Sequence, residues 1–363
     1  MRLALAAGGT GGHMFPAQAL AEEAKSRGWA VQLITDARGR RYTDGFPADE
    51  IVELTAASPS TGSMLSKAYA GFQLIGSANN ASGFLKVFGA EAVIGFGGYP
   101  SAPAMLAASR RRLPCGIHEQ NAIVGRANRL AARTARFLAH GFPVLKRQPR
   151  QIEVREVGNP VRRSVIRAAE IPFSSPGEGP IKLLIFGGSQ GASLFARVFT
   201  PALASLPEEL RERLEVTHQV VDGDREVAEA AYQAAGIKGE LAPFFADLPE
   251  RIAQSHLVIA RSGASSVSEL AVIGRPSILV PLKIAMDDHQ RFNAEVLTDV
   301  GGATLILEDD LTEESAAEAL LSLLSEPERL TQMADAAKGR MASGAAQVLA
   351  DMTAELVRPQ YRR

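Results

Sequence analysis

The sequence LALAAGGTGGHMFPAQALAEE, Leu3–Glu23, predicts a buried strand, a turn with four glycines and then an amphipathic helix. A similar pattern, LLIFGGSQGASLFARVF, occupies Leu183–Phe199. One copy begins each half of the chain. Because a strand, a tight turn and a helix form the start of a βαβ unit, we expect two domains of the same kind.

Short apolar runs alternate with helix-length segments throughout the chain. We expect strands at Leu3–Ala7, Val31–Thr35, Ala92–Phe96, Gly116–Glu119, Phe137–His140, Lys182–Phe186, Glu215–Val221, Leu257–Ala260, Ser277–Val280 and Thr304–Leu307. Helices are expected at Pro16–Ser26, Asp224–Ala235 and Glu313–Leu324, among others. This alternation predicts an α/β protein of two doubly wound, Rossmann-like domains that face each other across a cleft. Ligands bind such sheets at the carboxyl ends of the strands, where both glycine turns lie.

Composition excludes several classes of protein. A net charge of −1 argues against a nucleic-acid binder, and a single cysteine, Cys115, argues against a disulfide framework. The first residues, MRLALAAGG, enter a strand pattern directly instead of forming a signal peptide. No apolar run approaches the ~18 residues that span a bilayer. We therefore expect a soluble cytosolic protein, with the Pro-, Gly- and Ser-rich segment Val165–Pro180 as the linker between its domains.

The charge is unevenly distributed. Between Met105 and Arg167 there are fourteen Lys or Arg and three acids, a net of +11, so the rest of the chain carries −12. These cations indicate either solvated helix faces or a surface attracted to anionic lipid headgroups. The segment Met64–Phe88 offers large apolar side chains that either pack in the core or enter a membrane interface: Leu65, Tyr69, Phe72, Leu74, Ile75, Phe84, Leu85 and Phe88.

The glycine turns match neither of two common nucleotide motifs. Met14 stands where G-x-G-x-x-G requires its last glycine, and no G-x-x-x-x-G-K-[ST] motif occurs. What remains is a strand–glycine–helix junction, where backbone amides and the helix dipole favour an anion such as phosphate. Alternatively, the glycines serve only a tight turn.

His13 follows the first glycine turn, where the helix begins. A histidine there can be a polar surface residue or a hydrogen-bonding loop residue. A helix N-terminus also favours the neutral imidazole, which can accept a proton from a bound substrate as a general base.

Three further polar segments are candidate parts of a site, and the first two have two interpretations each. In Arg261–Glu269, the spacing of Ser266 and Glu269 indicates a capping box or a carboxylate that holds ribose hydroxyls. In Met286–Leu297, Asp287 and Asp288 either cap the next helix or hold a divalent metal. The polar segment His118–Arg129 ends a strand, and its first four side chains, HEQN, are expected in a cleft because they cannot all be core residues.

Six ordered motifs carry a resemblance that covers nearly the whole chain. They are GGTGGH (8–13), GFGGYPSAP (95–103), HEQN (118–121), GNPVR (158–162), GGSQGA (187–192) and RSGASSVSE (261–269). Together with the region of Gln290 they resemble the MurG family, the peptidoglycan N-acetylglucosaminyltransferases that make lipid II. The sequence LKIAMDDHQRFNA departs from the family, which more usually has a shorter run before a glutamine pair.

The resemblance implies a GT-B fold and an inverting transfer of N-acetylglucosamine. The donor would be UDP-N-acetylglucosamine, and the acceptor the C4 hydroxyl of muramoyl-pentapeptide on undecaprenyl diphosphate. Residues 1–163 would form an acceptor and membrane-facing domain, on which a C-terminal helix at about 344–363 packs back. Residues 164–343 would form the donor domain. The protein would be peripheral, on the cytoplasmic face of the bacterial inner membrane, beside cell-wall synthesis and division proteins.

The family also implies site residues. Those that bind the donor are Thr10, Gly11, Gly12, Asn121, Arg162, Ser189 and Gln290; those around the uridine are Phe245, Ala264, Ser265, Ser266 and Glu269. No metal or other cofactor is expected to be required. An in-line displacement needs a base on one side and anion stabilisation on the other. We assign the base to His13, with Glu119 as second candidate, and the stabilisation of UDP to the amides of Ser189–Ala192.

Three other functions fit the pattern. A GT-B nucleotide-sugar epimerase acting on UDP-N-acetylglucosamine would release UDP without an acceptor. An NAD-dependent oxidoreductase would use Asp36, at the end of the second strand, as its ribose-binding acid. A nucleotide sensor would bind without catalysis.

Overall fold

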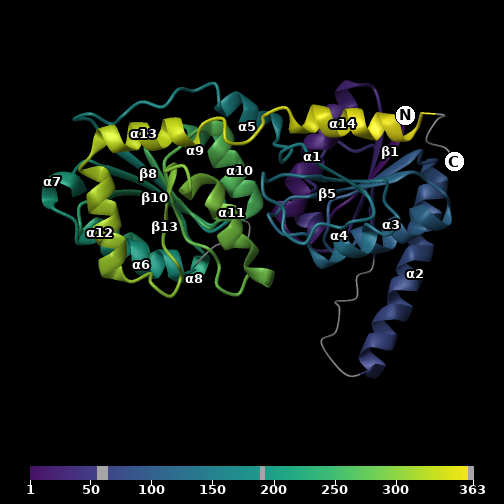
Figure 1. Ribbon diagram of the computed structural model, residues 1–363. Helices are drawn as coiled ribbons and strands as arrows, with labels where there is room; N and C mark the ends of the chain where they lie inside the picture. Colours follow the sequence, from purple (N-terminus) through teal and green to yellow (C-terminus); the bar gives the residue numbers. More distant parts are fainter. Residues whose placement is uncertain (55–63, 189–192, 359–363) are drawn as a thin grey trace. The chain divides into compact units, whose positions relative to one another are not determined.

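The computed structural model describes residues 1–54, 64–188 and 193–358, with the side chains of 64–72 excepted. It divides into two compact units (Figure 1). Unit 1 is Met1–Arg163 with the chain from Ala342 onward, and unit 2 is Ser164–Met341. Each unit is built around one parallel sheet.

The sheet of unit 1 has the order β3-β2-β1-β4-β5-β6-β7 among the described residues, and all its pairs are parallel. Its strands are β1 Arg2–Ala6, β2 Ala30–Thr35, β3 Glu50–Glu53, β4 Ala92–Gly95, β5 Cys115–Glu119, β6 Phe137–His140 and β7 Glu153–Glu156. Its helices are α1 Gly11–Ser26, η1 Gly39–Tyr42, α2 Met64–Phe88, α3 Ser101–Arg110, α4 Arg126–Ala131 and α14 Ala345–Leu356. The chain order reverses between β1 and β4, as in a doubly wound sheet.

The sheet of unit 2 repeats this plan with the order β10-β9-β8-β11-β12-β13. Its strands are β8 Ile181–Phe186, β9 Leu214–Gln219, β10 Lys238–Ala242, β11 Leu257–Ala260, β12 Ser277–Leu279 and β13 Ala303–Leu305. Its helices are α6 Ser193–Ala204, α7 Glu208–Arg211, α8 Asp222–Ala234, α9 Leu248–Gln254, α10 Ala264–Ile273, η2 Met286–Asp288, α11 His289–Thr298, α12 Glu313–Leu324 and α13 Pro327–Ala337. The short helix α5, Arg163–Ala168, lies at the boundary of the units.

Helices cover both faces of the sheet in unit 1 because its strands are apolar on both sides. Leu3 and Leu5 of β1 pack in a core with Leu20 of α1 and Leu349 of α14. Their neighbours on β1, Ala4 and Ala6, pack in a second core with α2 and α3. Successive strand residues point to opposite faces, so a continuous apolar run requires a layer on each side.

All ten predicted strands are confirmed to within two residues at either end, and so is the two-domain α/β class. The structure adds β3, β7 and β10, three edge strands that the sequence analysis missed. The helix predicted at Pro16–Ser26 begins earlier, at Gly11, so two of the four turn glycines form its first turn.

Candidate active site

In unit 1 the first glycine loop ends at an uncapped helix. Thr10 is the N-cap residue of α1 and makes no side-chain capping hydrogen bond, and the first turn contains no acid. The first amides of a helix have no acceptor within the helix, so they can bind an anion. Asp36 holds this loop in place, because its buried Oδ1 accepts hydrogen bonds from the amides of Gly9 (2.9 Å) and Gly39 (2.8 Å).

His13 lies in the first turn of α1 with a defined tautomer. Its Nδ1 is 3.1 Å from the carbonyl oxygen of Gly8, and a carbonyl can only accept. Nδ1 therefore carries a proton, and in the neutral imidazole Nε2 is the nitrogen that can accept one. The ring lies against Gly97, since a Cβ on that glycine would be 3.2 Å from Nε2. This orientation suits a proton acceptor.

Glu119 ends β5 and is buried in a dense set of donors. Its Oε1 accepts from the backbone amide (3.1 Å) and side-chain amide (3.2 Å) of Asn121. Its Oε2 accepts from Gly125 N (2.8 Å) and Asn128 Nδ2 (2.9 Å). Because both oxygens are engaged, Glu119 suits the role of holding the loop that carries Asn121 better than the role of base.

Most of the HEQN segment, which was expected in a cleft, lies in the interior: three of its four side chains are buried, and Asn121 is half-buried. His118, Glu119 and Gln120 are each at most 2% exposed. His118 donates from Nε2 to Gly158 O (3.0 Å) and accepts at Nδ1 from Gln120 Nε2 (3.0 Å). Burial lowers the pKa of His118 to about 4. Hydrogen bonds, not apolar contacts alone, make this polar core possible.

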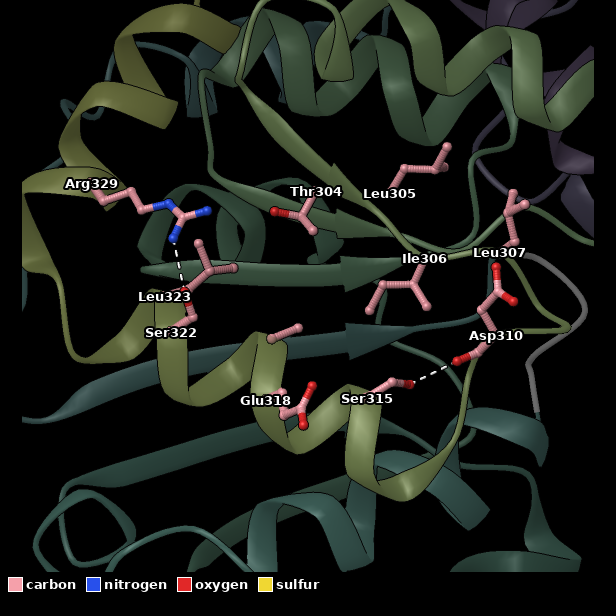
Figure 2. A pocket seen from close by; sticks show the side chains of 11 residues that line it. Thr304, Leu305, Ile306, Leu307, Asp310, Ser315, Glu318, Ser322, Leu323 and Arg329 are labelled. Carbon is pink, nitrogen blue, oxygen red and sulfur yellow. Dashed lines mark hydrogen bonds between the residues drawn. The ribbon is translucent and has the colours of Figure 1, made fainter.

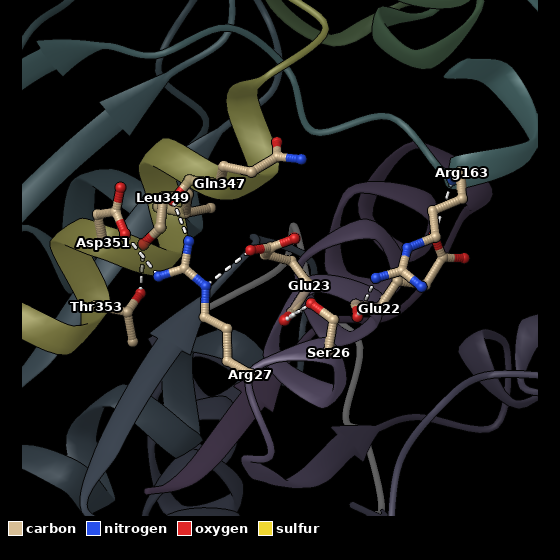
Figure 3. Close-up of polar contacts among 9 residues, drawn as sticks. All are labelled: Glu22, Glu23, Ser26, Arg27, Arg163, Gln347, Leu349, Asp351 and Thr353. Atoms are coloured by element: carbon tan, nitrogen blue, oxygen red, sulfur yellow. Dashed lines mark hydrogen bonds and ion pairs between the residues drawn. The ribbon is translucent and has the colours of Figure 1, made fainter. Parts of the chain in front are cut away.

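The two adjacent arginines of the GNPVR motif have different partners. The Arg162 guanidinium lies over the ring of Phe15, with 4.0 Å between its Cζ and the ring centroid. Arg163 faces α1: its backbone N donates to Glu22 Oε2 (2.8 Å) and its Nη2 to Glu22 O (3.3 Å), as Figure 3 shows. Arg163 is thus part of the scaffold, and Arg162 stays the predicted ligand-binding arginine.

In unit 2 the capping-box interpretation of Ser266 and Glu269 is wrong. Helix α10 begins at Ala264, with Gly263 as its N-cap and without a side-chain cap, so Ser266 is the third helical residue. The Glu269 side chain is buried in the second turn. Ser265 Oγ is buried and has no hydrogen-bond partner among the described residues. Among the described residues, the segment Ala264–Glu269 therefore offers one unsatisfied hydroxyl, that of Ser265, at the start of a helix.

The loop before α11 differs from the expected caps as well. Asp287 and Asp288 have positive φ angles of 58° and 56°, and the Asp288 side chain does not cap the helix. Gln290, in the first turn, accepts from Leu282 N at Oε1 (3.0 Å). Among the residues that the structure covers, no cluster of three or more His, Cys, Asp or Glu could hold a metal ion.

The remaining predicted residues are placed as follows. Phe245 is buried, and the Arg251 guanidinium lies 4.4 Å from its ring centroid. Ser189, like the rest of Ser189–Ala192, lies outside the described residues. A cavity of about 440 Å³ between β13 and α12 is lined by residues such as Ile306, Ser315 and Glu318, and by none of the predicted site residues (Figure 2).

The sequence predicts no role for Phe15, Asn128 and Asn159, which contact Arg162, Glu119 and Gln120. Asn159 Nδ2 donates to Gln120 O (2.9 Å), across 39 positions of sequence. Contacts of this range leave no local pattern. Asn128 lies inside the segment His118–Arg129 and Asn159 inside the GNPVR motif, and that placement could have drawn attention to both.

Comparison with known proteins assigns the family. The glycosyltransferase family 28 N-terminal domain matches residues 3–139, and the C-terminal domain of the same family matches residues 182–349. The chain belongs to glycosyltransferase family 28. The predicted enzyme class is thereby confirmed, and an NAD-dependent oxidoreductase is excluded.

Relatives of this family 28 enzyme match it over nearly its full length. The UDP-N-acetylglucosamine--N-acetylmuramyl-(pentapeptide) pyrophosphoryl-undecaprenol N-acetylglucosamine transferase of Caulobacter vibrioides is 48% identical, over 98% of both chains. The crystal structure of Acinetobacter baumannii MurG has a TM-score of 0.77 and 28% identity, and covers 98% of this chain and 99% of its own. The predicted resemblance to MurG and the GT-B fold are therefore confirmed. The UDP-GlcNAc 2-epimerase from Neisseria meningitidis shares the fold alone, with a TM-score of 0.65 at 14% identity, over 98% of this chain and all of its own.

Proposed function

We propose that this glycosyltransferase moves N-acetylglucosamine from UDP-N-acetylglucosamine to the C4 hydroxyl of undecaprenyl-diphospho-muramoyl-pentapeptide. The observation that carries the proposal is the orientation of His13: its Nδ1–H is used by Gly8 O, and its basic Nε2 lies over Gly97 beside an uncapped helix. A proton acceptor and a site for an anion then lie together, as a diphosphate-linked acceptor requires.

The reaction is one displacement at the anomeric carbon. Nε2 of His13 takes the proton of the C4 hydroxyl, and the C4 oxygen forms a bond to the anomeric carbon. The bond from that carbon to the UDP oxygen breaks, and UDP leaves with the electron pair. A positioned base contributes roughly 10²–10⁴ to the rate.

We assign the binding of the donor to Arg162 and to helix α10. The Arg162 guanidinium supplies a fixed cation for the diphosphate. In α10, the buried Ser265 hydroxyl and the Glu269 carboxylate can hydrogen-bond to the uridine ribose. We assign Gln290 to the sugar and the amides of Ser189–Ala192 to the departing phosphate, as the family resemblance implies.

The first test follows UDP release from UDP-N-acetylglucosamine with and without a short-chain lipid-linked muramoyl-pentapeptide diphosphate. We expect release that requires the acceptor, together with a disaccharide product. Release without acceptor would favour an epimerase or a hydrolase. Nucleotide binding without release would favour a sensor and overturn the proposal.

His13 is tested in the same assay by His13→Ala and His13→Asn. Either change removes the basic Nε2, so we expect kcat to fall roughly 10²–10⁴-fold while UDP-N-acetylglucosamine still binds. Wild-type turnover of His13→Ala would remove the residue from this role. Glu119→Gln is measured in the same assay. If Glu119 only positions the loop that carries Asn121, this change should alter KM more than the pH profile of the rate.

We also propose that the protein acts at an anionic membrane surface. The region Met105–Arg167 carries the net charge of +11, and Ile75 and Val87 of α2 are exposed, at 47% and 83%. Leu85 and Phe88 of the same helix belong to the core. No helix among the described residues is long and apolar enough to cross a membrane. Flotation with anionic liposomes at low salt tests surface binding, and an unbound protein would contradict it.

Metal ions are not part of the proposed mechanism. Cations for the leaving group come from Arg162 and from helix N-termini. We therefore expect EDTA to change the rate by less than about twofold. A larger loss, restored by Mg²⁺ or Mn²⁺, would assign a metal to the reaction.

A further inference from the structure

The guanidinium of Arg162 rests on an aromatic ring that is itself held in place. Its Cζ lies 4.0 Å from the centroid of the Phe15 ring. Tyr42 meets the same ring edge-on, with centroids 5.8 Å apart and an interplanar angle of 84°. Phe15 belongs to α1, two residues after His13, so the ring is part of a rigid element.

The backbone that carries Arg162 is fixed on both sides. Before it, His118 Nε2 donates to Gly158 O (3.0 Å), and Asn159 Nδ2 donates to Gln120 O (2.9 Å). After it, Arg163 N donates to Glu22 Oε2 (2.8 Å). The backbone at Arg162 is therefore fixed, and the side chain is the part that can still change conformation. Phe15 contacts that side chain.

A ring beneath a guanidinium has a defined effect on anion binding. The planar cation is attracted to the ring face, while its N–H donors remain at the edge, where they can meet phosphate oxygens. A long side chain that is already ordered loses less entropy when its ligand binds. The stack thus selects one orientation of Arg162 before the ligand arrives.

We infer that Phe15 is a positioning residue, whose ring holds Arg162 in the orientation that binds the diphosphate of the donor. The inference rests on the proposed function in one respect, the assignment of Arg162 to UDP-N-acetylglucosamine. Neither the glycine motif nor the GNPVR motif includes Phe15.

The test measures the Kd of UDP-N-acetylglucosamine by calorimetry, and kcat and KM by UDP release, for the full chain and its variants. Phe15→Leu removes the ring face and keeps an apolar side chain, so we expect Kd and KM to rise about three- to tenfold with kcat within about twofold of wild type. Phe15→Tyr keeps the ring and should keep the wild-type Kd. In an Arg162→Met background, Phe15→Leu should change Kd less than about twofold.

Phe88→Leu is the matched control. It removes another ring of unit 1 that lies under an arginine, with Arg2 Cζ 5.6 Å from the ring centroid, and Phe88 is outside the proposed site. We expect a lower thermal midpoint and an unchanged Kd. Circular dichroism of every variant separates loss of fold from loss of affinity.

Several results would overturn the inference. Equal effects of Phe15→Leu and Phe15→Tyr would show that side-chain volume matters and the ring face does not. An undiminished effect in the Arg162→Met background would show that Phe15 acts independently of the arginine. If the wild type binds UDP-N-acetylglucosamine but transfers nothing, the proposed function fails while the Kd series still decides the role of Phe15. If the wild type does not bind it, both fail.

Discussion

At the scale of single residues, one glycine sets how closely His13 lies against the loop after β4. Gly97 has a φ of +86°, and a Cβ there would meet His13 Cδ2 at 3.1 Å and Nε2 at 3.2 Å. Any side chain would therefore strain the backbone and push the imidazole away from its position.

We expect Gly97→Ala to lower kcat at least about tenfold and to reduce the free energy of unfolding by about 1–3 kcal/mol. Gly28→Ala is the control, because Gly28 also has a positive φ, +72°, but no atom within 4 Å of its Cβ position. It should lose stability alone. Equal activity of the two variants, measured by UDP release and urea unfolding, would contradict the role given to His13.

His118 makes the stability of unit 1 depend on pH. Burial lowers its pKa from 6.5 to about 4, with a smaller contribution from His140. Between these pH values the unfolded chain binds more protons at this position than the folded chain does. The contribution of neutral His118 to the free energy of unfolding is therefore fully present above about pH 6.5 and is lost as the pH falls toward 4.

His118→Gln retains a neutral amide that can donate toward Gly158 O, and it does not titrate. We expect wild type to lose about 2–3 kcal/mol more than this variant between pH 7 and pH 4.5, from the size of the shift. Urea unfolding followed by a unit 1 probe measures the difference. The buried His218 of unit 2, with a pKa of about 3, contributes equally to both proteins. Parallel pH profiles would refute the assignment.

The placement of the candidate residues was predictable, and their partners were not. Strand and glycine patterns put His13, Glu119 and the Arg261–Glu269 segment at the carboxyl ends of parallel strands. The donors to Glu119 and the ring under Arg162 come from distant residues. Periodicity describes neighbours within one element, so it does not predict which side chain a carboxylate or a guanidinium meets.

At the scale of elements, nearly all the strands that the sequence predicts carry continuous apolar runs. The three strands that it misses do not. β3 has the burial pattern exposed, half-buried, half-buried, exposed, and β7 and β10 are similarly open. Each pairs with one neighbour only, at the edge of its sheet. An edge strand has less apolar surface to bury, so backbone hydrogen bonds to the neighbour define it more than its side chains do.

Helix caps are also difficult to predict from the sequence, because a cap depends on backbone geometry. The S-x-x-E spacing at Ser266 is inside α10, whereas Thr312 of α12 forms an actual capping box with Ser315: Thr312 Oγ1 accepts from Ser315 N (3.2 Å), and Ser315 Oγ accepts from Thr312 N (2.9 Å). We expect Thr312→Ala to lower the free energy of unfolding by about 1 kcal/mol and Ser266→Ala by less than about half of that. Urea unfolding compares them, and the reverse order would restore Ser266 as a cap.

At the scale of the whole molecule, α1 carries part of the candidate site and also contacts the chain near the two points where it crosses from one unit to the other, after Arg163 and before Ala342. Its first turn carries His13. Near its other end, Arg27 bonds to Glu23 Oε1 (2.7 Å), to Asp351 Oδ1 (2.6 Å) and to Gln347 O (3.2 Å), which holds α14 (Figure 3). Glu22 holds Arg163 at the first passage. One helix thus anchors the chain where it leaves unit 1 and where it returns.

In unit 2 a buried arginine has the corresponding role for the linker. Arg275 is 1% exposed, and its guanidinium donates to backbone carbonyls: Ala253 O (2.9 Å), Ile273 O (3.0 Å), Gly274 O (2.9 Å) and Ile171 O (2.9 Å). Two of these carbonyls end helices α9 and α10, where the dipole favours a cation. Ile171 belongs to the linker, so Arg275 fixes the linker to unit 2.

We expect Arg275→Met to lower the stability of unit 2 by about 3 kcal/mol, because buried carbonyls lose their donor together. Hydrogen exchange should rise in Val165–Pro180 and in the ends of α9 and α10, while α1 and α14 keep wild-type protection, since the contacts of Arg275 lie within unit 2. Arg213→Met is the control: Arg213 holds the same linker at Gly179 O (3.0 Å), but at the surface, and should cost less than about 1 kcal/mol. If both variants loosened the linker equally, burial would not be the source of the anchor. If exchange also rose in α1, the two units would unfold as one, and the independence of their cores would be wrong.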